Sequence, residues 1–203
     1  MLNKYARAFF TALFTPVARF FLRHNITPDM VTVFGTIGVV LGALIFFPLG
    51  YLWWGSVFIT CFIFTDLIDG TMARLAGTTS RWGAFLDSTM DRIGDGAIFG
   101  GLVLYFMGRG DNPVIAYLAL LCMILGFTVS YAKARAESLG MTASGGIAER
   151  ADRLVIVLVA TGFVGLFLPE WVLTVTLIAL ALASSLTVWQ RMSQVREQTR
   201  LDG

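Results

Sequence analysis

The chain has 203 residues, of which 57% are hydrophobic and only 14% charged, and its formal net charge is +2. Together with a mean hydropathy of +0.76, this composition excludes an ordinary soluble domain and predicts an all-α protein that crosses the membrane several times. Cys61 and Cys122 both lie inside apolar runs, so neither a disulfide nor a thiolate metal site is expected.

The N-terminal stretch, residues 1–24, has an amphipathic pattern. Between Leu2 and Arg23 apolar residues recur at three- and four-residue steps, and basic residues lie near both ends. This pattern predicts a helix that lies in the membrane interface. A secretory signal peptide is the alternative, but Pro16 interrupts the run and no small-residue cleavage site follows it.

Six apolar stretches follow and predict six transmembrane helices within one domain, residues 25–203. Thr27, Pro28 and Asp29 form a helix start, because Thr caps an amide, Pro fits the first turn and Asp suits the positive helix end. The expected spans are residues 30–48, 52–76, 83–107, 113–136, 151–168 and 171–192. Close helix contacts are expected at the glycines of the third span, Gly94, Gly96, Gly100 and Gly101.

The basic residues predict the orientation. If the N-terminus is cytoplasmic, every Lys and Arg except Arg109 lies on the cytoplasmic side of the six spans. An even number of spans returns the C-terminus to that side. We therefore expect a multi-pass protein of the plasma membrane, with both termini and the polar site facing the cytoplasm.

The most informative stretch runs from Asp66 to Arg92. Asp66 and Asp69 lie three residues apart and Asp87 and Asp91 four apart, so each pair shares one face of its helix. A charged side chain at the bilayer centre costs about 2.5–3.5 kcal/mol on insertion scales, so a cation is expected among the four acids. Oxygen ligands without His or Cys suit Mg²⁺, Mn²⁺ or Ca²⁺, and four Asp from two helices can hold two ions.

Small residues accompany the acids. Gly70 and Ala73 follow the first pair and Gly83 precedes the second, which leaves the backbone open to a flat or phosphorylated ligand. Arg74 offers that ligand an anion contact.

Two other interpretations of the acids remain. In a purely structural hairpin they would pair with arginines for topology alone. A cation transporter would spread them through the depth of the bilayer, whereas here only Asp95 continues one turn deeper, where it suits a proton or metal accessory.

The pattern D-x-x-D-G-x-x-A-R, eight residues, then G-x-x-x-D-x-x-x-D resembles the signature of the CDP-alcohol phosphatidyltransferase family. The matching positions are Asp66, Asp69, Gly70, Ala73, Arg74, Gly83, Asp87 and Asp91. The resemblance implies an integral membrane enzyme that moves a phosphatidyl group from CDP-diacylglycerol, or a phospho-base from a CDP-linked donor, onto an alcohol and releases CMP. It also implies a homodimer, two Mg²⁺ ions (or Mn²⁺) on the four Asp, and Asp91 as proton acceptor.

The donor is expected near the start of the first span, whose first backbone N–H groups have no helical partner. The Ser80 hydroxyl, in the loop before the third span, can add a contact. The predicted donor-binding residues are Asp29, Met30, Val31, Thr32, Gly70, Ala73, Arg74 and Ser80.

A second polar group lies at the cytoplasmic ends of the last three spans and comprises Ser130, Lys133, Arg135, Arg153 and Arg191. Topology alone would place cations there, but a basic pocket beside a metal site also suits an acceptor that carries a phosphate. The runs SYAKARAES and GGIAERADR are most similar to actinobacterial phosphatidylinositol phosphate synthases, which implies inositol 1-phosphate as acceptor. Glycerol 3-phosphate is the alternative, because it too is anionic. Membrane lipid is an expected partner and nucleic acid is not.

Overall fold

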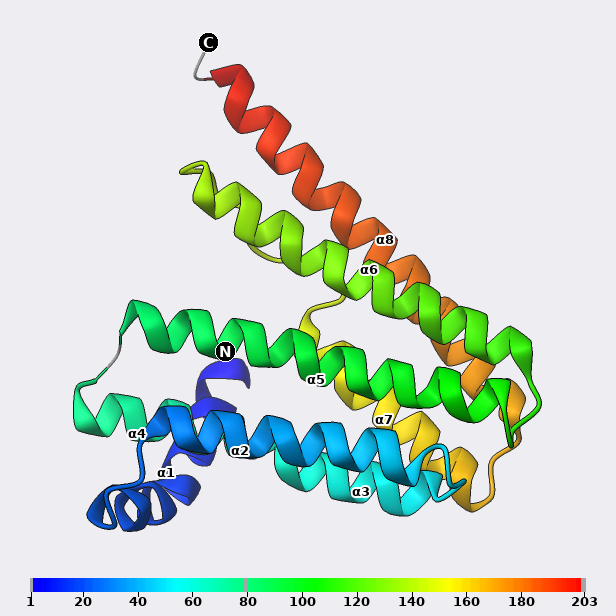
Figure 1. Cartoon of the computed structure of the whole chain (residues 1–203). Coiled ribbons are helices and arrows are strands. Elements are labelled where there is room, and N and C mark those ends of the chain that lie inside the picture. The colour runs from blue at the N-terminus through cyan, green and yellow to red at the C-terminus, as the bar shows by residue number, and fades with distance from the viewer. Residues whose placement is uncertain (1, 79, 202–203) are drawn as a thin grey trace.

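The computed structural model describes residues 2–78 and 80–201, with side chains from residue 13 to residue 200, and this part of the chain is all-helical (Figure 1). The elements are α1 (Leu2–Arg23), α2 (Pro28–Leu41), the π-helix η1 (Gly42–Phe46), α3 (Leu52–Ile63), α4 (Thr65–Ala76), α5 (Arg81–Met107), α6 (Pro113–Ser138), α7 (Arg150–Leu166) and α8 (Glu170–Leu201).

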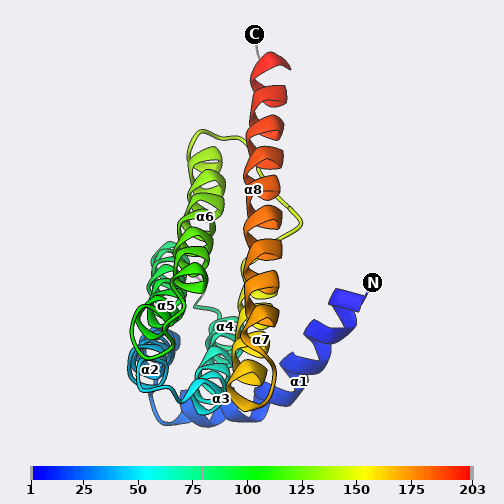
Figure 2. The same ribbon diagram turned by 90° about the vertical axis from the view of Figure 1, so that its right-hand side faces the viewer.

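The long helices form a bundle that is open at one end. α6 and α8 pack along each other, meet α5 and α7 at the closed end, and diverge from the N-terminal half of α5 (Figure 1). α1 runs across the direction of the other helices (Figure 2) and packs on α4. Apolar side chains from α2, η1, α3 and α5 to α8 fill the closed part of the bundle.

Four stretches of the described chain are long and apolar enough to cross a membrane: Pro28–Phe46, Leu52–Ala76, Pro113–Ser138 and Glu170–Arg200. α5 and α7 lie beside them (Figure 1) but are less typical, because α5 carries several charges in its N-terminal half and α7 has only 17 residues. The chain is therefore a helical membrane protein, and the count of six spans remains a prediction.

The predicted second span is two helices rather than one. The break lies at Phe64, where the Thr65 hydroxyl donates to the Phe62 carbonyl at 2.6 Å. Hydroxyls that bond to backbone carbonyls in this way compete with regular helix bonding and bend the chain. The break just precedes Asp66, so it sets the direction in which α4 presents its acids.

The N-terminal stretch is helical, as predicted. Ala18 of α1 packs with Val31 and Met72 in a small cluster that joins α1, α2 and α4. Its position relative to the membrane interface remains a prediction, because the side chains of Lys4 and Arg7 lie outside the part of the chain whose side chains are described.

Of the four glycines predicted to allow close contacts in α5, Gly101 does so most clearly. A Cβ at Gly101 would overlap the carbonyl oxygen of Ala43 in η1, and one at Gly96 would come within 3.2 Å of a ring atom of Phe127. A Cβ at Gly100 would meet nothing within 4 Å. Gly100 therefore makes no close contact within the described part of the single chain, and the close contact expected there remains a prediction.

This difference gives a matched test. Gly101→Ala is expected to destabilise the protein by about 1–3 kcal/mol, because η1 and α5 must move apart. Gly100→Ala is expected to leave stability unchanged or slightly higher, since Ala is the better helix former. Thermal unfolding of both variants in detergent measures this, and equal midpoints would contradict the packing.

Candidate active site

α4 and α5 bring the motif acids to the open side of the bundle. Asp69 is buried, and its Oδ2 accepts a hydrogen bond from the Thr32 hydroxyl of α2 at 2.5 Å. Asp66, one turn earlier on α4, is partly exposed, and Asp87 on α5 is exposed. Asp66, Asp69 and Asp87 line one cavity, whereas Asp91 lines a neighbouring one, so three of the four motif acids face a shared space.

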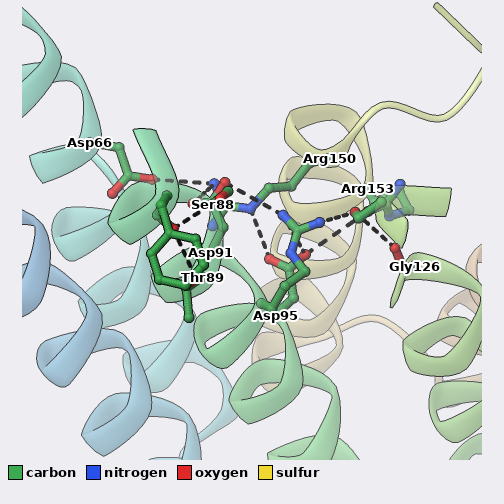
Figure 3. Close-up of polar contacts among 11 residues, drawn as sticks. Asp66, Ser88, Thr89, Asp91, Asp95, Gly126, Arg150 and Arg153 are labelled. Atoms are coloured by element: carbon green, nitrogen blue, oxygen red, sulfur yellow. Dashed lines mark hydrogen bonds and ion pairs between the residues drawn. The ribbon is translucent and has the colours of Figure 1, made fainter. Parts of the chain in front are cut away.

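One guanidinium links the acids of the two helices (Figure 3). Nη1 of Arg150 lies 2.7 Å from Asp91 Oδ1 and 3.3 Å from Asp66 Oδ2, and its Nε lies 2.9 Å from Asp95 Oδ1. The sequence analysis did not select Arg150. The available signal was its place three residues before Arg153, which puts both on one face of the same helix.

Asp95 binds arginines. It is only 4% exposed, and besides Arg150 it has Arg92 Nη2 at 3.8 Å and Arg153 Nη2 at 3.9 Å. A buried carboxylate is tolerated when cations surround it, and each arginine is held in turn. Asp95 therefore organises the basic side chains, which differs from the proton or metal accessory predicted from its place on the helix.

Two cavities meet at the acids. The first, of about 650 Å³, lies between α2, α4 and α5; besides the three acids it is lined by six predicted donor residues, Asp29, Thr32, Gly70, Ala73, Arg74 and Ser80. The second, of about 880 Å³, lies between α5, α6, α7 and α8; its lining includes Asp91, Arg150 and four predicted acceptor residues, Ser130, Lys133, Arg153 and Arg191. A narrow gap between them is lined by Asp66, Asp91 and Arg150.

Two predicted donor contacts are wrong. The Met30 N–H donates to the Thr27 hydroxyl and the Val31 N–H to the Thr27 carbonyl, each at 3.3 Å. Thr27 therefore caps α2, as predicted, but its cap uses the N–H groups that were expected to be free for an anion. Ser80 also caps, since its hydroxyl accepts the Gly83 N–H at 3.0 Å, although it lines the first cavity as well.

The buried arginines of the second cavity are only partly satisfied by the protein. Arg153, 2% exposed, donates from Nη1 to the Ala148 carbonyl at 2.8 Å, and its buried Nη2 makes no hydrogen bond within the described chain. Arg191, 6% exposed, donates to the carbonyls of Val129 and Gly145. Arg191 thus holds the loop before α7 to α8, whereas among the described residues Nη2 of Arg153 has only the 3.9 Å ion pair with Asp95.

The other predicted acceptor residues divide into two groups. Ser130 accepts from Arg92, and Lys133 lies 3.9 Å from Glu137; both line the second cavity. Arg135 does not line the cavity and instead donates to Ser138 at 3.3 Å. Its predicted place in the pocket was wrong, because residues two apart in a helix point in different directions.

The chemistry of the motif acids suits a hard divalent cation. All the candidate ligands are carboxylate oxygens, which Mg²⁺, Mn²⁺ and Ca²⁺ prefer. In the described residues no three His, Cys, Asp or Glu side chains converge tightly on one point, and Arg150 separates Asp66 from Asp91. The ligand types therefore fit a divalent ion once Arg150 moves.

A helical membrane protein in which two cavities meet at a cluster of acids can hold two molecules side by side and transfer a group from one to the other. The family model described as CDP-alcohol phosphatidyltransferase matches residues 25–189. The chain belongs to the CDP-alcohol phosphatidyltransferase family and is an enzyme of that type, which excludes the cation transporter and the purely structural hairpin.

Relatives cover nearly the whole chain. The phosphatidylinositol phosphate synthase of Streptomyces avermitilis is 52% identical over 205 residues, which covers 98% of this chain and 84% of the relative. That of Cutibacterium acnes is 48% identical, with 94% and 95% covered.

Solved structures of the Mycobacterium tuberculosis phosphatidylinositol phosphate synthase have the same fold. The crystal structure with CDP-DAG bound is 41% identical and matches with a TM-score of 0.86, covering 91% of this chain and 94% of that one. A structure of that enzyme in complex with manganese and citrate matches with a TM-score of 0.83 at 41% identity, covering 90% and 88%. A divalent metal is thus consistent with both the relative and the acids of this chain.

Proposed function

We propose that this enzyme transfers the phosphatidyl group of CDP-diacylglycerol to inositol 1-phosphate and releases phosphatidylinositol phosphate and CMP. The observation that carries the proposal is the second cavity, where the cationic side chains of Lys133, Arg150 and Arg153 line the same space as the motif acid Asp91. A neutral alcohol would not need this charge, whereas a phosphate accepts charge-assisted hydrogen bonds from Arg and Lys. The names of the relatives support the same acceptor.

The first cavity is the proposed donor site. A Cβ at Gly70 would have only the end of the flexible Arg74 side chain within 4 Å, so the helix face stays open for a nucleotide. Arg74 is exposed and lines this cavity, so it can turn toward the diphosphate.

Mg²⁺ is the proposed cofactor, as two ions on Asp66, Asp69, Asp87 and Asp91, with Mn²⁺ as the alternative. When bound, the ions withdraw charge from the donor diphosphate and favour its cleavage. The chain itself orients the ligands, because the Thr32 hydroxyl fixes the position of Asp69.

The bond from Thr32 gives a direct test of the metal site. Thr32→Val keeps the side-chain shape but removes the donor to Asp69, and such outer partners of metal ligands are worth about 10–100-fold in affinity. We expect Mn²⁺ binding to weaken by that factor. Thr36→Val is the control, because that hydroxyl donates to a backbone carbonyl of its own helix; an equal loss in both variants would contradict the role of Thr32.

Asp91 is the proposed proton acceptor. It is the motif acid that lines the second cavity and the gap, so an acceptor hydroxyl that enters from the second cavity reaches it first. The attacking hydroxyl then lies between Asp91 and the donor phosphate in the first cavity, which is the order that an in-line displacement needs. The hydroxyl proton passes to the Asp91 carboxylate as the hydroxyl oxygen attacks the phosphorus and CMP leaves.

The placement in the cell is also proposed. The distribution of basic residues supports six spans with both termini and the active site at the cytoplasmic face of the plasma membrane, and α1 in the interface. A homodimer is proposed from family membership.

The test uses the purified chain in detergent with CDP-diacylglycerol. CMP release should require both Mg²⁺ and inositol 1-phosphate. Release that persists without metal, or that fails with inositol 1-phosphate while proceeding with uncharged alcohols, would contradict the proposal.

A further inference from the structure

Arg150 lies where a cation shared by Asp66 and Asp91 would bind. Its Nη1 is 3.3 Å from Asp66 Oδ2 and 2.7 Å from Asp91 Oδ1. A divalent ion held by both carboxylates needs oxygens at about 2.0–2.6 Å, which leaves no room for a guanidinium nitrogen between them. Arg150 and such an ion are therefore alternative partners of the same two acids.

Arg150 also has an ion pair with Asp95, which can hold its side chain when the contacts with Asp66 and Asp91 are lost. Its Nε lies 2.9 Å from Oδ1 of Asp95, which is 4% exposed and does not belong to the proposed ligands. This ion pair does not depend on Asp66 or Asp91, so the end of the guanidinium can leave them while Nε stays anchored. Arg150 already lines the second cavity as well as the gap, so that cavity is open to it.

We infer that Arg150 competes with the divalent ion for Asp66 and Asp91, and that ion binding turns its Nη atoms into the second cavity to meet the phosphate of the acceptor. Arg150 is in this account a positioning residue that couples the two halves of the active site. Because coupling between two ligands is reciprocal, acceptor phosphate must also strengthen ion binding. The inference rests on the metal ligands of the proposed function and not on which anionic alcohol is used.

The test measures Mn²⁺ binding to the full chain in detergent, from the electron paramagnetic resonance signal of free Mn²⁺. Arg150→Met removes the competitor, so the affinity for Mn²⁺ should rise about 10- to 100-fold, the equivalent of one charged hydrogen bond. Lys133→Met removes the same charge from the second cavity without a contact to Asp66 or Asp91, and it should change the affinity much less. Arg150→Lys keeps the charge without the fork of donors and should fall between wild type and Arg150→Met, which provides a second variant if Arg150→Met folds poorly.

The coupling between Mn²⁺ and the acceptor phosphate provides a measurement that would not change if the role of Arg150 were only structural. In the wild type, inositol 1-phosphate should tighten Mn²⁺ binding severalfold, and in Arg150→Met this effect should largely disappear. Unchanged or weaker Mn²⁺ binding in both Arg150 variants, or an equal gain in Lys133→Met, would overturn the inference and leave the proposed function standing. A wild type that does not bind Mn²⁺ would instead contradict the proposed metal site itself.

Discussion

Asp69→Asn is expected to lower CMP release on the order of a hundredfold or more, because it removes the charge of a proposed metal ligand without changing its size. Asn still has an oxygen that can accept the Thr32 hydrogen bond, so the fold should be kept and the loss should reflect chemistry. The measurement is CMP release from CDP-diacylglycerol at saturating Mg²⁺, with thermal unfolding as a check on the fold.

Asp152→Asn is the matched control for this loss. Asp152 is an exposed carboxylate near the start of α7, and it lines neither cavity. Its replacement should leave turnover close to that of the wild type. Near wild-type CMP release by Asp69→Asn would contradict the two-metal proposal.

Arg153→Ala is expected to raise the KM for inositol 1-phosphate about 10- to 100-fold, which corresponds to one lost charged hydrogen bond of about 1.5–3 kcal/mol. The reason is that its buried Nη2 makes no hydrogen bond within the described chain and lies beside the cavity. The KM for CDP-diacylglycerol should change little, because Arg153 lies away from the first cavity.

Arg135→Ala tests whether the rise in the KM for inositol 1-phosphate is specific to residues that line the second cavity. Arg135 lies two residues after Lys133 on α6 but bonds to Ser138 on its own helix and does not line the second cavity, so its removal should leave both KM values unchanged. If Arg153→Ala raised the KM of donor and acceptor alike, Arg153 would be a structural residue that holds the loop at Ala148.

The pairing of the motif acids and most of the residues that line the first cavity could be predicted because helical spacing determines which side chains share a face. Asp66 with Asp69 on α4 is such a case, and the cap at Thr27 follows equally local rules. The break at Phe64 was missed, because a single hydroxyl bond within a long apolar run does not change the hydropathy pattern.

Contacts across the bundle were harder to predict. The link from Arg150 to Asp66 joins residues far apart in sequence. The place of Arg150 three residues before Arg153 was a local signal, but a topological anchor could have the same spacing. The prediction for Arg135 was wrong because its neighbours in sequence suggested a place in the pocket, whereas its side chain on α6 points toward Ser138. Gly100 and Gly101 could not be told apart without knowing which side of α5 faces η1.

The most direct test of the central claim is competition between acceptors. The purified enzyme receives CDP-diacylglycerol, Mg²⁺ and equal concentrations of inositol 1-phosphate, glycerol 3-phosphate and free inositol, and the lipid products are separated. The account predicts that phosphatidylinositol phosphate is the main product. A product that is mainly phosphatidylglycerophosphate would contradict the inositol assignment, and mainly phosphatidylinositol would contradict the phosphate-binding role of the second cavity.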